Sequence, residues 1–185
     1  VTDYICSLYP QFPIAPLVNN WNGHEWDGGG LGRMLADPKA RARNIEQLAA
    51  YVDRNHFTGL CIDYENIAAG DRLNFQNYIN ELCAILHSRK VFVTVAVPAT
   101  NPGFPYKELA EHADALILMV YDEHWADGSP GPIASQLWFR QVLDQRKRDV
   151  PANKMIVGVG NYAYDWAEGR PADVRTFTEV VQIAI

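Results

Sequence analysis

Two acidic residues, Asp63 and Glu65, follow an apolar segment and could carry acid–base chemistry. The segment Gly59-Leu-Cys-Ile-Asp63 has the composition of a buried β-strand. Residues two apart on a strand point to the same face, so the two carboxylates are expected side by side at the carboxyl end of the strand. Carboxylates this close interact, and one of them can hold a proton near neutral pH, which is what a general acid needs. The alternative is a solvated strand end with no catalytic role.

The elements that must position this pair alternate between strand-like and helix-like patterns. The strands are nearly uniformly apolar, which is typical of a parallel sheet covered on both faces, and their alternation with helices predicts right-handed βαβ units. Residues 21–31, rich in glycine and aromatic residues, are expected to form a loop. The predicted strands are 13–20, 60–64, 91–97, 115–121 and 154–160, and the predicted helices are 37–52, 73–86, 106–112, 133–146 and 173–185.

Polar and aromatic residues follow every predicted strand. The carboxyl ends of parallel strands share one rim, which is the usual place for an active site in an α/β fold. The residues at this rim are Asn19, Asn20 and Trp21; Asp63 and Glu65; 98–101; Tyr121, Asp122 and Trp125; and Asn161, Tyr162, Tyr164 and Trp166.

The motifs at these strand ends resemble those of glycoside hydrolase family 18, the chitinase-like (β/α)8 barrels. Residues 59–65 look like the Asp-Gly-x-Asp-x-Asp-x-Glu signature, 118–122 are similar to the Met-x-Tyr-Asp strand, and 154–166 are similar to the later Gly-x-x-x-Tyr-Gly-Tyr-Asp-Trp strand. The nearest resemblance is to the branch that acts on bacterial cell-envelope polysaccharides. It implies an α/β fold, a (β/α)8 TIM barrel present as an incomplete piece with about strands three to seven. Residues 1–185 would form a single partial glycosidase-like domain of a longer protein, fused to further domains.

The resemblance also implies a mechanism that needs no metal or cofactor. Glu65 would protonate the glycosidic oxygen, and the substrate's own 2-acetamido carbonyl would attack the anomeric carbon. Asp63 would orient the acetamido nitrogen and stabilise the oxazolinium intermediate, while Tyr121 would hydrogen-bond the acetamido oxygen. Further contacts with the sugar are expected from Asn20, Trp21, Asp122, Trp125, Tyr162 and Trp166.

The chain departs from the family pattern at Cys61, where most chitinases have the innermost aspartate of the signature. A thiol is a weak hydrogen-bond donor and cannot replace that carboxylate fully. We therefore expect a pH profile that differs from that of a chitinase. Thr58 and Ala163 also replace family residues, an aspartate and a glycine.

Bulk properties narrow the choice of partner. The formal net charge of −6 argues against nucleic acid and anionic membranes as partners, and no apolar run has the length of a transmembrane helix. No signal peptide is evident, although the family suits an extracytoplasmic location, periplasmic or secreted. The expected function is hydrolysis of a polysaccharide that contains β-linked N-acetylglucosamine. The alternatives are a catalytically silent carbohydrate-binding barrel and an open doubly wound α/β domain with an unrelated ligand.

Overall fold

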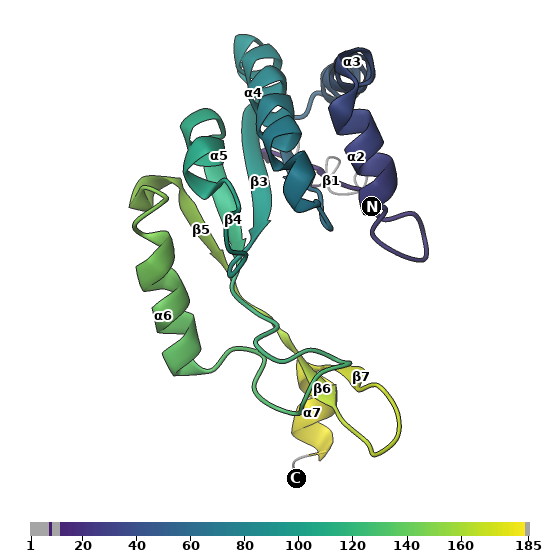
Figure 1. Ribbon diagram of the computed structural model, residues 1–185, viewed down its shortest axis with the longest axis vertical. Helices are drawn as coiled ribbons and strands as arrows, with labels where there is room; N and C mark the ends of the chain where they lie inside the picture. The colour runs from purple at the N-terminus through teal and green to yellow at the C-terminus, as the bar shows by residue number, and fades with distance from the viewer. Residues whose placement is uncertain (1–7, 9–11, 184–185) are drawn as a thin grey trace. The chain divides into compact units, whose positions relative to one another are not determined.

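The computed structural model describes residue 8 and residues 12–183, and its chain divides into two compact units (Figure 1). The first unit comprises the chain up to residue 96 together with residues 103–116. The second comprises residues 97–102 and the chain from residue 117 onward. Within the described residues, no helix combines the length and the apolar character needed to cross a membrane.

Five strands form one sheet in chain order, as the sequence predicts. They are β1 (Leu17–Asn19), β2 (Gly59–Asp63), β3 (Phe92–Pro98), β4 (Ala115–Met119) and β5 (Met155–Gly158). The pairs β1–β2 and β2–β3 are parallel, and Asn19 lies opposite Asp63 in the register. The carboxyl ends of β1 and β2 therefore coincide, as a parallel α/β active site requires.

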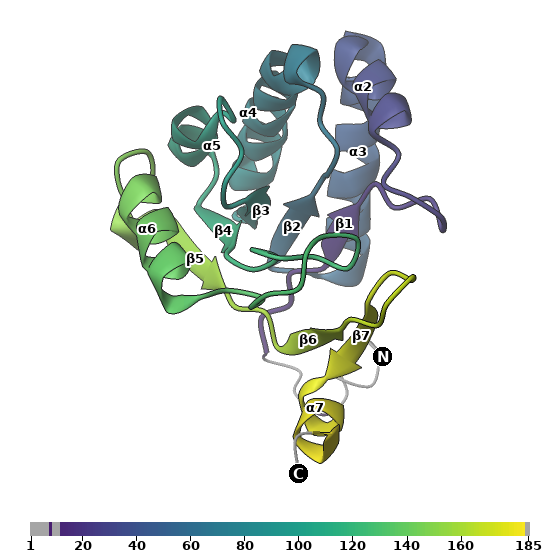
Figure 2. The same cartoon turned by 60° about the horizontal axis from the view of Figure 1, so that its bottom comes forward.

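Helices follow the strands in the predicted alternation. They are α2 (Gly28–Ala36), α3 (Pro38–Asn55), α4 (Arg72–Ser88), α5 (Tyr106–His112) and α6 (Gln136–Arg146), with short 3₁₀ turns at Ala69–Asp71 and Ala152–Lys154. Helix α3 begins as expected, because the Asp37 carboxylate accepts a hydrogen bond from the Lys39 N–H at 2.9 Å and Pro38 occupies the first turn. In the first unit α2, α3, α4 and α5 pack in sequence, and Figure 2 shows these helices on one side of strands β1 to β3.

The two faces of strand β2 have different roles. Leu60 and Ile62 are fully buried, and so is one apolar face of α4. Cys61 and Asp63 belong to the opposite face of the strand. One face of β2 thus anchors the sheet in the core while the other carries the groups that can do chemistry. The fully buried apolar side chains of α4 are Phe75, Tyr78, Ile79, Leu82 and Leu86.

The prediction of a loop over residues 21–31 is wrong for its last part. Helix α2 starts at Gly28, capped by the Asp27 carboxylate, which accepts a hydrogen bond from the Gly30 N–H at 2.6 Å. A Cβ atom on Gly28 would lie 2.4 Å from the Asn66 main-chain oxygen. The glycine run is therefore a closely packed helix start rather than a flexible loop, because tertiary contacts outweigh the low helix propensity of glycine.

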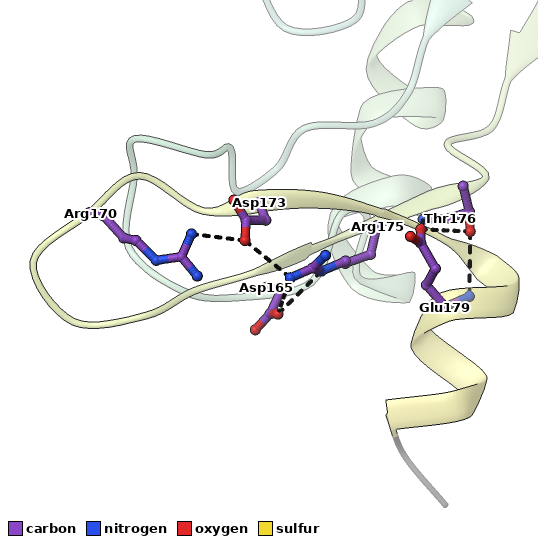
Figure 3. A network of polar contacts seen from close by, with 6 residues as sticks. All are labelled: Asp165, Arg170, Asp173, Arg175, Thr176 and Glu179. Atoms are coloured by element: carbon purple, nitrogen blue, oxygen red, sulfur yellow. Dashed lines mark hydrogen bonds and ion pairs between the residues drawn. The ribbon is translucent and has the colours of Figure 1, made fainter.

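The C-terminal part also differs from its prediction as one helix from Asp173 onward. Strand β6 (Tyr162–Asp165) pairs antiparallel with β7 (Asp173–Thr176), and only then does α7 (Phe177–Ile183) begin. Asp165 and Asp173 lie directly opposite, which alone would be unfavourable. Figure 3 shows Arg175 bridging both carboxylates at 3.0 Å, so the hairpin depends on a cross-strand contact that helix periodicity cannot reveal.

A reciprocal cap sets the start of α7. The Thr176 N–H and hydroxyl donate to the Glu179 carboxylate at 2.7 and 2.8 Å, and the Glu179 N–H donates back to the Thr176 hydroxyl at 3.3 Å (Figure 3). This is a capping box, which satisfies main-chain donors at a helix start. It explains why the strand changes to a helix at this position.

Candidate active site

Asp63 is the last residue of β2 and has an unusual environment. Its Oδ1 atom is buried and has no hydrogen-bond partner among the residues that the structure describes. Burial raises the pKa of the Asp63 carboxyl. A buried carboxylate oxygen without a partner is costly, and such groups are found preferentially at functional sites.

Glu65 lies just beyond the strand, in the loop that follows β2, and is half-buried. The strand ends at Asp63, so the expected side-by-side geometry of two strand residues does not extend to Glu65. The position of Glu65 depends instead on a contact with the loop after β1.

Asn20 makes that contact with both ends of its amide group. Its Nδ2 donates to the Glu65 main-chain oxygen at 3.0 Å, and its Oδ1 accepts from the Glu65 N–H at 2.9 Å. The two residues are 45 positions apart in the chain. The side chain thus mimics a further rung of the β1–β2 ladder directly after the Asn19–Asp63 pair. Asn20 was expected to bind sugar, and the structure places it where it positions the Glu65 loop.

A pocket of about 260 Å³ opens beside Asn20 in the same unit. Trp21 on its wall is 48% exposed, and its ring meets the Trp26 ring edge to face, with centroids 5.5 Å apart. An exposed indole beside polar amide groups suits a sugar ring, which offers both an apolar face and hydroxyl groups. The polar part of the lining includes Asn19, Asn20, Asn22 and Asp27.

Cys61 is buried below Asp63 on the same face of β2. Burial raises the pKa of its thiol, a hydrogen bond with Thr94 opposes that effect, and the nearby Asp63 carboxylate adds to it. The thiol is therefore neutral at ordinary pH. The position that carries an aspartate in most chitinases thus supplies no second charge to Asp63.

A second group of predicted residues lies in the other unit, after β4 and on β6. Asp122 accepts hydrogen bonds from the hydroxyls of Tyr162 and Tyr164 at one atom, Oδ1. The Tyr162 hydroxyl donates to Asp122, and the expected contact of Tyr162 with sugar stays a prediction. No role was predicted for Tyr164. Its spacing of two from Tyr162 puts both on one face of a strand, but β6 was not predicted.

The Tyr162 and Tyr164 rings belong to a longer row of aromatic side chains. Ring centroids are 6.2 Å apart for Tyr121 and Tyr162, 5.6 Å for Tyr162 and Tyr164, and 5.5 Å for Tyr164 and Trp166. The row needs Gly160, because a Cβ atom there would lie 3.0 Å from the Cβ of Tyr121 and 3.1 Å from the Tyr162 ring. The site residues Tyr121, Tyr162 and Trp166 therefore form one packed row.

Two tryptophans of this unit that were predicted to contact sugar, Trp125 and Trp166, are placed where a ligand could reach them. Trp125 is 55% exposed. A pocket of about 280 Å³ is lined by Trp166 and by Asp127 and Arg170. The Trp166 Nε1 atom is buried and has no partner in the part of the chain that the structure covers. Contact of these side chains with sugar stays a prediction, as does the convergence of Asp63, Glu65 and Tyr121 at one rim.

A strand–helix chain whose parallel strands end in carboxylate, amide and aromatic side chains has the pattern of the (β/α) barrels, which carry their active sites at the carboxyl ends of the strands. The sequence model described as glycosyl hydrolases family 18 matches residues 2–182. The chain therefore belongs to glycosyl hydrolase family 18, as its motifs predicted.

Individual relatives support both the family and the fold. The uncharacterised glycosylase YvbX of Bacillus subtilis is 28% identical over 177 residues, covering 89% of this chain and 52% of YvbX. A cortical fragment-lytic enzyme of the same organism is 25% identical, covering 83% of this chain and 39% of the enzyme. The crystal structure of a chitinase from Chromobacterium violaceum superposes with a TM-score of 0.87 at 28% identity, covering 98% of this chain and 59% of the chitinase.

The fold class, a (β/α)8 barrel of which this chain holds a part, is confirmed by that superposition. The chain spans about half the length of the relatives that it matches.

Proposed function

We propose that the protein is a glycoside hydrolase that cleaves a β-linked N-acetylglucosamine polysaccharide by a substrate-assisted, retaining mechanism. The observation that carries the proposal is Asp63, a carboxylate with a buried and unpartnered oxygen, two residues before Glu65 at the end of a parallel strand. Family membership supplies the reaction class, and the exposed Trp21 beside a pocket suits a saccharide ligand.

The proposed steps use the two carboxylates differently. Glu65 donates its proton to the glycosidic oxygen as the bond to the anomeric carbon breaks, and the 2-acetamido carbonyl oxygen of the substrate forms a new bond to that carbon. Asp63 accepts a hydrogen bond from the acetamido N–H and offsets the positive charge of the oxazolinium ring. Glu65, now ionised, takes a proton from water as the water opens the ring.

The relatives suggest which polymers to test. One is named as an enzyme that lyses cortical fragments and another as a chitinase. We propose peptidoglycan or chitin as the substrate, with action outside the cytoplasm and with further domains in the full-length protein. The net charge of −6 does not favour binding to anionic polymers.

The test is hydrolysis by the full-length protein of N-acetylglucosamine oligomers and of purified peptidoglycan, with products identified by mass spectrometry and the anomer by NMR. Release of the β-anomer at early times supports the retaining mechanism. Early release of the α-anomer contradicts it. Binding without release of product from any of these polymers would favour the carbohydrate-binding alternative.

Replacing Asn20 by alanine is expected to lower kcat more than it raises KM. The two hydrogen bonds to the Glu65 main chain are worth about 1 kcal/mol each, so we expect a loss of roughly 10–100-fold in kcat/KM. Steady-state kinetics measure this, with Asn80→Ala on the exposed face of α4 as the matched control. A rise in KM with kcat unchanged would show that Asn20 contacts the sugar itself.

A further inference from the structure

The Asp122 carboxylate accepts both of its tyrosine hydrogen bonds at one oxygen, Oδ1, and this suggests how it binds a ligand. We propose that Tyr162 and Tyr164 are positioning residues that fix the Asp122 carboxylate through Oδ1, so that Oδ2 becomes the acceptor for a hydroxyl or amide N–H of the bound saccharide. The saccharide in this statement rests on the proposed function, whereas the tyrosine–carboxylate contact does not.

The geometry of the three residues carries the inference. Both tyrosine hydroxyls donate to the same oxygen, Tyr164 at 3.1 Å. A carboxylate oxygen has two lone-pair sites, so two donors use the hydrogen-bonding capacity of Oδ1. Oδ2 receives no hydrogen bond from any residue within the described ranges, and the Asp122 side chain is exposed. A further donor is therefore directed to Oδ2.

The backbone of Asp122 is also constrained. Its φ of 60° lies in the left-handed region, where aspartate is tolerated better than most residues but is still less stable than in the usual regions. The two hydrogen bonds hold the side chain of a residue in this conformation. The arrangement preorganises an acceptor, which reduces the cost of ordering it when a ligand binds.

The same geometry limits what the two tyrosines can do. Each hydroxyl has one proton, and that proton is donated to Asp122. While these bonds persist, neither tyrosine can donate to a sugar, and only Asp122 recognises a donor group. The cluster therefore selects a ligand group with a proton to give, such as a free hydroxyl, over an ether oxygen at the same place.

The first experiment is a double-mutant cycle in the full-length protein. Tyr164→Phe and Tyr162→Phe should each lower kcat/KM by about three- to tenfold, mainly through KM, because a ground-state contact is weakened. Asp122→Gly removes the carboxylate without backbone strain at a positive φ. In that background either tyrosine substitution should change kcat/KM by less than twofold, because residues that act through one another are not additive. Tyr51→Phe on the surface of α3 is the matched control.

The second experiment measures the contact without any substrate. Burial, and then the hydrogen bond and charge of Asp122, raise the pKa of Tyr162. Burial, and then the charge and the hydrogen bond of Asp122, raise the pKa of Tyr164, while Tyr162 lowers it and Asp127 adds a smaller increase. Asp122→Gly should lower both tyrosine pKa values toward the ordinary range without reaching it, as followed by NMR of ¹³C-labelled tyrosine.

The outcomes separate this inference from the proposed function. Unchanged tyrosine titrations in Asp122→Gly would overturn the inference whether or not the protein cleaves a polymer. Cleavage with additive effects of Tyr164→Phe and Asp122→Gly would overturn it too. Shifted titrations with no cleavage of any polymer would support the tyrosine–carboxylate contact and count against the proposed function alone.

Discussion

Glu65→Gln is expected to lower kcat by roughly 10²–10⁴-fold, the usual contribution of a general acid, while leaving polymer binding intact. Glutamine has the shape of glutamate but no acidic proton to donate to the glycosidic oxygen. The hydrogen bonds to Asn20 involve the main chain of residue 65, so they survive the substitution and keep the loop in place. Initial rates and binding isotherms with the same oligomers separate the two effects.

The control for this substitution is Glu46→Gln, an exposed glutamate on α3 that should leave the rate unchanged. Full activity of Glu65→Gln would remove Glu65 from the mechanism. Loss of binding together with activity would assign Glu65 to substrate recognition rather than to proton transfer.

Asp63→Asn is expected to lower kcat by roughly 10²–10³-fold and, unlike most substitutions at an active site, to stabilise the fold. The loss of activity follows because a neutral amide cannot offset the positive charge of the intermediate. The gain in stability follows because the ionised carboxylate has a buried oxygen without a partner. Removing the charge relieves part of that cost, about 1 kcal/mol, which corresponds to an increase in Tm of about 2–4 °C at this chain length.

The pH dependence of stability gives an independent check on Asp63. Burial raises the pKa of this carboxyl above its value of 3.8 in the unfolded chain, so the folded state binds the proton more tightly. Protonated Asp63 therefore contributes favourably to the stability of the fold below pH 3.8. This contribution is lost as the pH rises through the raised pKa of Asp63. The higher Tm of Asp63→Asn relative to wild type should therefore appear above the raised pKa of Asp63 and disappear below pH 3.8.

Thermal unfolding between pH 3.5 and 7.5 measures this difference. Asp144→Asn, at an exposed position on α6 beside Lys147, is the matched control and should change Tm by less than a degree or two. A lower Tm for Asp63→Asn at pH 7 would show that the Asp63 carboxylate has a stabilising partner.

Local patterns were sufficient for the strand–helix order. Helix α5 has the predicted bounds, Tyr106–His112, and α3 starts at the predicted cap because Asp37 and Pro38 act within one turn. The prediction of a continuous helix from Asp173 is wrong because the β6–β7 ladder requires cross-strand partners. The helix start at Gly28 was missed for a similar reason, since its close packing against Asn66 is invisible in a glycine run.

The sequence by itself was sufficient for the family and the strand–helix order, and it predicted the acidic pair, because each depends on residue types at short spacing. Only the tertiary structure decided how these groups are held. Asn20 reaches Glu65 across 45 residues, and Tyr162 and Tyr164 reach Asp122 across 40 and 42. Such contacts depend on where distant loops and strands end, which is set by packing and register and not by any local pattern.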